Sequence, residues 1–596
     1  MIGILGGEII MGIFSRLSWF FKRQWKQYLI GVTALILVAI CNVIPPRIIG
    51  NIVDTVSKKN MTTRYLAINM TILFVVAILQ YLLRFLWQKM IYGSSYVLER
   101  ELRSRLFRHF MKMDSTFYQK WRTGDLMAHA TNDIDAVRDV AGPGILTLAD
   151  SLITGTSMIL AMGLFINWRL TLMAVLPLLL LALMANVLGG KIHTAFKDSQ
   201  AAFSNINNKT QESIVGIKVL KALGQEKEDE ADFDKYVDEN IKANKRSYRL
   251  DAMFDPLTTL IMGISYTLTI IFGGLAVLNQ RITIGQLVSF ITYMAELMWP
   301  MYAVGSLFNL LERGSASYDR IDELLAEKSS LVKTENAFTT VPNGSINFAI
   351  DKFHYPDDQA TALRNVHFKL NAGQTLGIVG PTGGGKSTII GLLMRDFDHY
   401  DGAINVGKID IRKYDLNSYL DTIGYVPQTN FLFSTDVRNN VRFANIKATE
   451  EQVESATHIA DLDGDISQMS DGYDTQVGEL GVSLSGGQKQ RLAIARAVLS
   501  DPKLLILDDS LSAVDSKTER NIETRIADNR RHGTTIIAAS RLSSVENADE
   551  IIVVADGTIV EKGTHQELLN QAGWYADTFN LQAKNAELEG RLSNEK

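Results

Sequence analysis

The sequence predicts a helical membrane domain followed by an α/β domain with a phosphate-binding loop. Uncharged stretches long enough to cross a bilayer crowd the first half of the 596 residues, whereas charged residues return in the second half. The second half contains a full match to the phosphate-loop pattern, Gly380-Pro381-Thr382-Gly383-Gly384-Gly385-Lys386-Ser387. Further along, a glycine-rich turn at Ser485 leads to an apolar strand that ends at Asp508. A chain of this length exceeds one hydrophobic core, so at least two domains are expected.

Composition excludes several classes of protein. Basic and acidic residues nearly balance, at 60 and 65, so we expect no nucleic-acid partner. Cys41 is the only cysteine and lies in an apolar run, so the chain has no disulfide framework and needs no oxidising compartment. Residues 1–10 are apolar but short and lack a basic start, so we interpret them as a retained leader rather than a signal peptide.

Residues 11–26 combine aromatic side chains with cations, which is typical of a helix lying in the membrane surface. The alternative is a plain N-terminal extension of the first membrane helix. We therefore expect residues 1–26 to hold the leader and this interfacial helix.

Six stretches within residues 27–327 are long and apolar enough to cross a lipid bilayer as helices. They are expected at about 27–50, 65–86, 140–168, 170–190, 253–280 and 282–312. A soluble protein would need six such runs by accident. Well inside these spans, only Asp150 and Glu296 are acidic. Ionisable groups at that depth usually face a cavity or a partner, so both are candidates for a substrate site, the alternative being hydrogen bonds between helices.

Two connections, 84–139 and 191–255, hold ten and eleven Lys or Arg residues, whereas the opposite connections are short or modestly charged. The positive-inside rule places the N-terminus, both long connections and the second half of the chain in the cytoplasm. Both connections are helical in pattern and would extend beyond the lipid, with short interruptions at 115–126 and 221–226. Phe117, Tyr118 and Trp121 would be costly on a solvated hairpin tip, so we expect the first interruption to contact another domain.

A polar linker over 328–342 leads to the α/β domain, 343–582, and to a C-terminal tail, 583–596. The phosphate loop lies between an apolar strand, 375–379, and an apolar helix, 388–394, as this motif requires. Its glycines allow backbone N–H groups to approach phosphate, Lys386 adds a positive charge at the terminal phosphates, and the Ser387 hydroxyl can bind Mg²⁺.

The turn Leu484-Ser485-Gly486-Gly487-Gln488, a helix, and the strand 504–507 that ends in Asp508 and Asp509 follow the phosphate loop in this order. Together these motifs resemble the nucleotide-binding domain of ATP-binding cassette (ABC) transporters. The resemblance implies an α/β ATPase domain with an antiparallel β subdomain and a helical subdomain. It also implies that ATP and Mg²⁺ are the cofactors and that ATP hydrolysis is coupled to transport.

The resemblance further implies a role for each motif residue. Nucleotide-binding residues would be Gly380, Pro381, Thr382, Gly383, Gly384, Gly385, Lys386, Ser387, Thr388, Ser485, Gly486, Gly487 and Gln488, with Tyr355 stacking on adenine. Ser387, Gln428 and Asp508 match the Mg²⁺ site. Residues 512–515 match the loop that crosses to a second cassette, and 475–479 match the segment that precedes the signature turn in exporters. The two interruptions resemble the coupling helices of type I exporters.

Two positions depart from the family pattern. Asp509 stands where the family has the glutamate that polarises the attacking water, and Ser540 stands where the family has the histidine of the switch loop (539–542). Asp is one methylene shorter than Glu, and a misplacement of that size can reduce a rate by about a hundredfold. The chain therefore keeps the groups that bind ATP and lacks part of those that split it.

This combination resembles the degenerate subunit of heterodimeric bacterial multidrug ABC exporters, over nearly the whole chain. The resemblance implies a half-transporter of the cytoplasmic membrane that exports small hydrophobic, amphipathic or cationic compounds with a second, non-identical subunit. Its Ser485, Gly487 and Gln488 would complete the partner's competent ATP site. Two alternatives stay open: a homodimeric lipid or drug exporter with slow hydrolysis, and an ATP-gated channel or regulator.

Overall fold

The computed structural model describes residues 12–594, apart from 333, 357, 479, 480, 482, 483, 531 and 532. The predicted leader at 1–10 and Glu479, in the segment before the signature turn, lie outside the described residues. The chain divides into two compact units. The helical unit holds residues up to Lys112 and from Arg122 to Glu327, and the sheet unit holds Met113–Trp121 and the residues from Lys328 onward.

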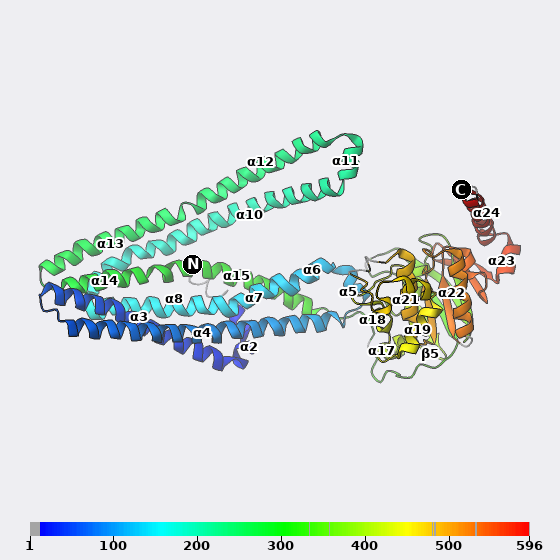
Figure 1. Ribbon diagram of the computed structural model, residues 1–596, viewed down its shortest axis with the longest axis horizontal. Coiled ribbons are helices and arrows are strands. Elements are labelled where there is room, and N and C mark those ends of the chain that lie inside the picture. The colour runs from blue at the N-terminus through cyan, green and yellow to red at the C-terminus, as the bar shows by residue number, and fades with distance from the viewer. Residues whose placement is uncertain are drawn as a thin grey trace. The chain divides into compact units, whose positions relative to one another are not determined.

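The described residues of the helical unit form helices and short connections (Figure 1), and several helices are joined by short π-helical or 3-10 turns. The helices are α2 (Ser18–Arg23), α3 (Trp25–Ser57), α4 (Thr63–Phe110), α6 (Thr123–Ala128), α7 (Ile134–Asp139), α8 (Ile145–Met162), α9 (Trp168–Val175), α10 (Leu179–Val215), α11 (Ile217–Leu223), α12 (Glu226–Asp251), α13 (Phe254–Leu278), α14 (Ile284–Glu296) and α15 (Met298–Ala326).

Four helical stretches among the described residues are long and apolar enough to cross a membrane: Trp25–Ser57, Thr63–Phe110, Thr123–Leu178 and Glu226–Leu278. The backbone of Asn167 is extended (φ −162°, ψ 117°) and its side chain caps α9, so the third stretch contains a helix break at the predicted 167–169 connection. The predicted spans 170–190 and 282–312 are each divided, by the 3-10 turn Leu176–Leu178 and by Leu297. The number of six spans stays a prediction.

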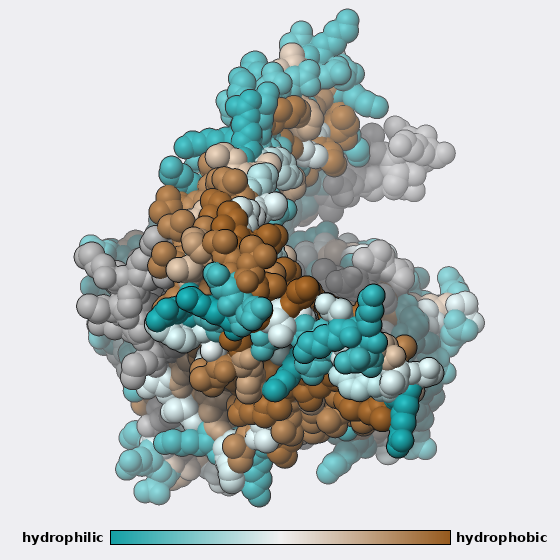
Figure 2. Space-filling view, turned by 90° about the vertical axis from the view of Figure 1, so that its left-hand side faces the viewer, coloured by the Kyte–Doolittle hydropathy of each residue, from teal (hydrophilic) through white to brown (hydrophobic). Residues whose placement is uncertain are grey.

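Large apolar side chains of α4 and α13 point outward, among them Phe74, Phe85, Ile271 and Leu275. Figure 2 looks at the left-hand end of Figure 1 and shows hydrophobic residues over much of this face, with hydrophilic residues gathered in patches. An apolar surface of this extent is typical of a protein that lipid surrounds.

Helix α14 packs closely against α3. A Cβ atom on Gly50 of α3 or on Gly285 of α14 would overlap the backbone of the other, so both positions need glycine. Asp54 accepts a hydrogen bond from the Gly285 N–H at 2.8 Å, and the Ser289 hydroxyl donates to the Pro46 carbonyl at 2.8 Å. Close backbone approach and interhelical hydrogen bonds hold helices together where no hydrophobic driving force acts.

The helix expected to lie in the membrane surface at residues 11–26 stays a prediction. Ile13, Leu17 and Phe20 are fully buried, and the Arg105 guanidinium of α4 lies 4.0 Å from the centroid of the Trp19 ring. Part of the apolar face of this segment therefore packs on neighbouring helices, whereas Trp25 is 54% exposed.

Helices α10 and α12 lie side by side and carry α11 at their far end (Figure 1). The second predicted interruption, 221–226, is shifted. Helix α11 lies between Gly216 and Gly224, and Gly224 takes a left-handed conformation (φ 65°) that glycine adopts without strain. The break therefore begins five residues earlier than the sequence pattern indicated, at Gly216.

The sheet unit has two sheets. Strands β6 (Ile423–Val426), β7 (Leu504–Asp508), β8 (Thr534–Ala538), β3 (Thr375–Val379) and β9 (Glu550–Ala555) run parallel in one sheet, which β10 (Thr558–Gly563) extends antiparallel at the edge. Strands β2 (Thr361–Leu370), β1 (Ile346–His354), β4 (Asp401–Val406) and β5 (Ile409–Asp410) form an antiparallel sheet. All five residues of β7 are buried, as a central parallel strand requires.

Helices complete the sheet unit: α5 (Ser115–Lys120), α16 (Lys386–Leu393), α17 (Leu416–Leu420), α18 (Val437–Arg442), α19 (Glu450–Ile459), α20 (Asp463–Gln468), α21 (Gly486–Leu499), α22 (Ser516–Asn529), α23 (His565–Gln571) and α24 (Trp574–Asn594). The predicted fold class, a helical transmembrane domain followed by an α/β domain with an antiparallel subdomain and a helical subdomain, is confirmed. The predicted boundary between domain and tail, at 582/583, falls inside α24, so the tail is not a separate element.

Candidate nucleotide-binding site

The phosphate loop follows the carboxyl end of β3 and opens α16. Gly380 (φ 145°) and Gly385 (φ 111°) lie in the region that favours glycine, and a Cβ atom on Gly380 would overlap the Val554 carbonyl of β9. Gly385 is the N-cap of α16, so the free N–H groups of the first turn face the loop. Loop residues Gly380 to Gly385 thus take the conformation of a turn that can bind an anion, the role that the sequence predicts for them.

Lys386 folds over the phosphate loop. Its Nζ donates to the carbonyls of Gly380 at 2.8 Å and Pro381 at 3.0 Å. Burial lowers the pKa of Lys386, and the nearby carboxylates of Asp509 and Asp508 oppose that shift. The ammonium group is therefore held against the loop, close to the two acids at the end of β7.

Ser387 and Asp508 meet across the site, where the Ser387 hydroxyl hydrogen-bonds the Asp508 carboxylate. Asp508 is only 6% exposed. Burial raises its pKa, the negative charge of Asp509 raises it further, and the Ser387 hydrogen bond opposes both. The structure therefore brings together a hydroxyl and a carboxylate, which are hard oxygen ligands.

Tyr355 lies just beyond β1. Its hydroxyl is 2.8 Å from the Thr388 hydroxyl of α16, and its ring packs edge-on against Phe353 and Phe397, with centroids 5.2 and 5.4 Å away. This fixes the ring beside the helix that follows the phosphate loop.

Asp509 and Ser540, the two positions that depart from the family pattern, contact each other. Asp509 has a left-handed backbone (φ 46°), which Asp tolerates better than most residues. Its N–H donates to the Ala538 carbonyl at 2.7 Å, and its Oδ1 accepts from the Ser540 N–H at 3.1 Å. The carboxylate of Asp509 is therefore bound to the backbone of the switch loop.

The signature turn is fixed by its own side chains. Ser485 is the N-cap of α21 and forms a capping box with Gln488, in which each side chain accepts from the other's backbone N–H, at 3.3 and 2.9 Å. The Gln488 amide also donates to Asp465 of α20 at 2.8 Å. Gly486 and Gly487 form the first residues of α21, so their N–H groups are unpaired by helix geometry.

Sequence reasoning missed Gln490, which joins the signature helix to the loop 512–515. Its Oε1 accepts from the Ala513 N–H at 3.0 Å, and its Nε2 donates to Ser512 at 3.3 Å. Gln490 follows the signature turn by two residues, but only the fold brings the loop to it.

Gln428 lies two residues beyond β6 and is exposed.

Helix α5 is part of the sheet unit. Ser115 donates to Asp396 at 2.8 Å, and Asp114 accepts from the Ser329 and Ser330 hydroxyls at 2.8 and 2.9 Å. Burial alone would raise the pKa of Asp114, but hydrogen bonds from Ser329, Phe117 and Ser330 lower it. Phe117 is 5% exposed, so its ring is covered as its cost in water predicted, whereas Tyr118 is 44% exposed.

We expect that two cysteines introduced by mutation, one in α5 and one in the linker, form a disulfide. The Thr116 and Ser330 hydroxyl oxygens are 3.4 Å apart, so cysteines at both positions should cross-link under mild oxidation in a Cys41→Ala background. Moving the first cysteine to Lys120, about 6 Å further along the helix, gives the matched control. Equal cross-linking of both pairs, seen as band shifts after proteolysis of the connection, would contradict this contact.

The two intramembrane acids differ in their surroundings. Asp150 of α8 accepts a hydrogen bond from Thr154, one turn further along the same helix, at 3.0 Å. Glu296 is the last residue of α14, beside the break at Leu297, and its side chain is exposed. Asp150 is thus bound within its own helix, whereas Glu296 is presented at a helix end.

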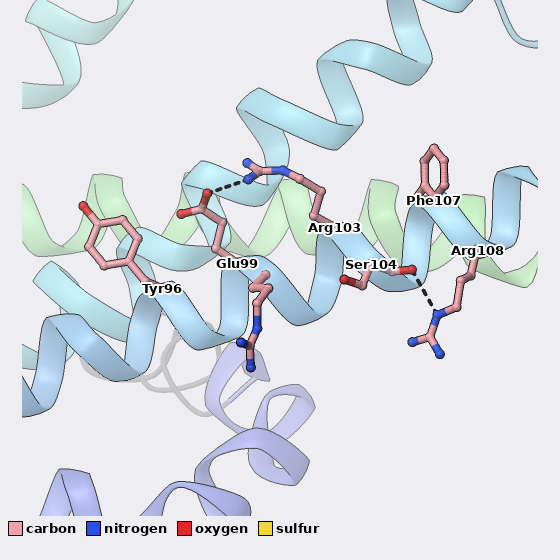
Figure 3. A pocket seen from close by; sticks show the side chains of 7 residues that line it. Tyr96, Glu99, Arg103, Ser104, Phe107 and Arg108 are labelled. Atoms are coloured by element: carbon pink, nitrogen blue, oxygen red, sulfur yellow. Dashed lines mark hydrogen bonds and ion pairs between the residues drawn. The ribbon is translucent and has the colours of Figure 1, made fainter. Parts of the chain in front are cut away.

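A groove of about 750 Å³ follows one face of α4 (Figure 3). Its lining residues are Tyr96, Glu99, Arg100, Arg103, Ser104, Phe107 and Arg108. Arg103 pairs with Glu99 at 2.8 Å, and the Arg108 Nε donates to the Ser104 carbonyl at 3.2 Å. Arg103 also donates to the Ala130 carbonyl, outside α4, at 3.2 Å, so both arginines are bound by groups of the protein.

Fold and site together define an ATPase-coupled membrane transporter. Two family models match the chain, "ABC transporter transmembrane region" over residues 28–301 and "ABC transporter" over residues 363–512. The chain belongs to the ABC transporter family and has the architecture of a type I exporter.

The chain is 41% identical over 584 residues to Multidrug resistance-like ATP-binding protein MdlA of Escherichia coli (strain K12), covering 98% of this chain and 99% of that protein. It is 39% identical over 573 residues to Probable multidrug resistance ABC transporter ATP-binding/permease protein YheI of Bacillus subtilis (strain 168), covering 96% and 98%. A solved structure of a bacterial Atm1-family ABC exporter with ATP bound shares the fold, with a TM-score of 0.79 at 24% identity, covering 94% of this chain and 99% of that one.

Proposed function

We propose that this chain is one half of a heterodimeric multidrug-type exporter of the cytoplasmic membrane, and that its own ATP site binds nucleotide but hydrolyses it weakly. One observation carries the proposal: the groups that bind phosphate are complete, whereas Asp509 and Ser540 occupy the two water-activating positions and bind each other at 3.1 Å. Both relatives named above carry multidrug resistance in their names, which supports this class of transport.

The residues at the site fit Mg²⁺ together with ATP. Among the described residues, no group of three or more His, Cys, Asp or Glu side chains could hold a metal ion. Mg²⁺ prefers one or two protein oxygen ligands plus substrate phosphates, and Ser387 and Asp508 supply such a pair. Gln428 is the third residue that we assign to the ion. When bound, the ion neutralises the phosphate charge that Lys386 also contacts.

Weak hydrolysis follows from what Asp509 and Ser540 can reach. The Asp509 carboxylate is one methylene shorter than that of Glu, and the switch-loop N–H already holds it. The Ser540 side chain lacks the length and the ring nitrogen of the family's histidine. Together these changes leave the attacking water without a well-placed base, which can reduce the rate by about a hundredfold or more.

A second subunit completes both sites. Ser485, Gly486, Gly487 and Gln488 form the turn that the family places on the partner's phosphates, and their N–H groups at the start of α21 favour an anion. Helix α11 exposes Val219 and Leu223, at 61% and 68%, which would be costly in water. We assign this apolar tip to the cassette of the partner subunit, as a coupling helix. The partner is then a chain that retains Glu and His at the two altered positions.

Glu296 is our first candidate for contact with a cationic substrate. Replacing Glu296 by Gln should lower transport of permanently cationic dyes by about tenfold and leave neutral substrates unaffected, because only a charged partner is lost. Transport into inverted vesicles measures both. The matched control is Asp150→Asn, which should leave selectivity unchanged because Asp150 binds Thr154. A lower melting temperature of Glu296→Gln with unchanged selectivity would instead indicate a role in helix packing.

Two measurements separate the alternatives. Purification with and without a co-expressed second chain distinguishes a heterodimer from a homodimer, since only the homodimer hydrolyses ATP alone at the full rate. Accumulation of substrate against its gradient in sealed vesicles distinguishes a pump from a channel, because a channel only equilibrates concentrations.

A further inference from the structure

Helix α24 is fixed to the core of the sheet unit by its first two turns. Tyr575 is fully buried, its hydroxyl lies 2.8 Å from His565 Nδ1, and its ring stacks on Phe579. Glu561 of β10 accepts from the N–H groups of Trp574 and Tyr575, at 2.5 and 3.2 Å. Positions three and four apart share one face of a helix, so the buried face that holds 575 and 579 also carries residue 582.

On this face the side-chain amide of Gln582 binds the switch loop twice. Its Oε1 accepts from the Leu542 N–H at 2.9 Å, and its Nε2 donates to the Ser540 carbonyl at 3.0 Å. Both halves of the amide are used, one as acceptor and one as donor. The arrangement therefore requires an amide, since neither a methyl group nor a carboxylate can make both bonds.

Ser540 is held from two sides. Its carbonyl accepts from Gln582, and its N–H donates to the carboxylate of Asp509 at 3.1 Å. Hydrogen bonds thus connect Gln582 of α24 to the backbone of Ser540, and the backbone of Ser540 to Asp509 at the water-activating position. Asp509 in turn contributes to the electrostatics of Lys386 and Asp508.

The other anchors of this region hold different atoms. Arg541 donates to the Val514 carbonyl at 3.2 Å, and Ser544 donates to the buried carboxylate of Glu519. These bonds fix the Arg541 side chain and the turn at Ser544 that follows the switch loop. Among the described residues, the bonds that hold the Ser540 carbonyl and the Leu542 N–H come from Gln582.

We propose that Gln582 is a positioning residue of the ATP site, which makes the C-terminal helix part of that site. By holding the backbone of residues 540 and 542, it sets where residue 540 and the Asp509 carboxylate stand relative to the terminal phosphate. The expected effect on ATP hydrolysis rests on the proposed function, but the structural coupling between Gln582 and Asp509 does not. It exists equally in a homodimer or a heterodimer.

Hydrogen exchange of the purified full chain, in its native assembly, tests the coupling directly. In Gln582→Ala, the Leu542 amide loses its acceptor and the Ser540 amide should exchange about fivefold faster or more, because a loosened loop weakens its bond to Asp509. Lys584→Ala, an exposed change on the same helix, should alter neither amide. Unchanged exchange at Ser540 in Gln582→Ala would overturn the inference, and would leave the proposed function untouched.

Single-turnover ATP hydrolysis gives the functional readout, in a pair whose partner carries Gln for its catalytic Glu, so that only this chain's site reacts. We expect Gln582→Ala to lower the hydrolysis rate about fivefold without changing the ATP concentration at half-saturation. Gln582→Glu should be at least as damaging, because an oxygen then faces the Ser540 carbonyl.

A double-mutant cycle with Asp509→Ala separates positioning from general destabilisation. If Gln582 acts through Asp509, the double variant should be little worse than Asp509→Ala alone. Additive losses, or an equal loss in Lys584→Ala, would contradict the inference. Should the chain prove to be a homodimer, the same cycle on its own turnover keeps the test valid while the proposed function fails.

Discussion

Replacing the catalytic glutamate of the partner subunit should lower the steady-state ATP turnover of the purified pair by about a hundredfold or more, whereas Asp509→Ala should lower it by less than about threefold. The first change removes the base of the competent site. The second falls on a slow site, whose carboxylate already binds the Ser540 N–H and which contributes little to the steady-state turnover of the pair. Phosphate release from the pair in lipid nanodiscs measures both.

In contrast to Asp509→Ala, a mutation in the signature turn of this chain should lower turnover strongly. Gly487→Val should cut turnover by about tenfold or more, because the added side chain obstructs the turn that serves the partner's site. A Cβ atom on Gly487 would already meet the Ala513 carbonyl at 3.0 Å, so the loop 512–515 would shift as well. Binding of a fluorescent ATP analogue to Lys386 and its loop should persist, which shows that the variant is folded.

Equal losses of turnover from changes in the two subunits would contradict the proposal. If Asp509→Ala were as damaging as loss of the partner's glutamate, this chain's site would be catalytically competent. The chain would then be a slow homodimeric exporter or an equal partner. The control is Lys584→Ala, an exposed change on α24 outside the ATP site, which should leave turnover unchanged.

Asp398→Ala should destabilise the sheet unit by about 3–5 kcal/mol, because it leaves a buried arginine without its counter-charge. Arg395 and Asp398 are almost fully buried and 2.8 Å apart. Asp398 also accepts from the Val332 N–H of the linker at 2.9 Å, and Arg395 donates to the Tyr414 carbonyl at 2.9 Å. Slow-exchanging amides of β6 and β7 in the full chain report the loss, since a two-domain protein has no single unfolding transition.

Two further variants identify the cause of that loss. Asp398→Asn keeps an oxygen for Val332 and should recover part of the stability. Replacing Arg395 by Met together with Asp398 by Leu removes both charges at similar volume and should be nearly neutral. If the double replacement were as damaging as Asp398→Ala, packing of the linker, and not the unpaired charge, would explain the effect.

Much of the fold could be predicted because its signals are local in the chain. Apolar runs mark the membrane helices, and the strand Thr375–Val379 appears within the bounds expected from its composition and its place before the phosphate loop. The break at Gly216 was missed because a single glycine in a long polar helix is a weak signal. Helix α24 continues across the predicted tail boundary at 582/583 because nothing in the sequence breaks the helix there.

The sequence by itself determined which positions depart from the family pattern and predicted which residues bind phosphate, because a phosphate loop, a signature turn and a strand-end acid each need particular residue types at short spacing. Only the tertiary structure decided that Asp509 binds Ser540, that Ser115 meets Asp396, and that Gln582 holds the switch loop. In the first and last of these bonds a side chain pairs with a backbone group distant in sequence. Any residue type supplies a backbone N–H or carbonyl, so such a bond leaves no pattern in the chain until the fold brings the two groups within 3 Å or so.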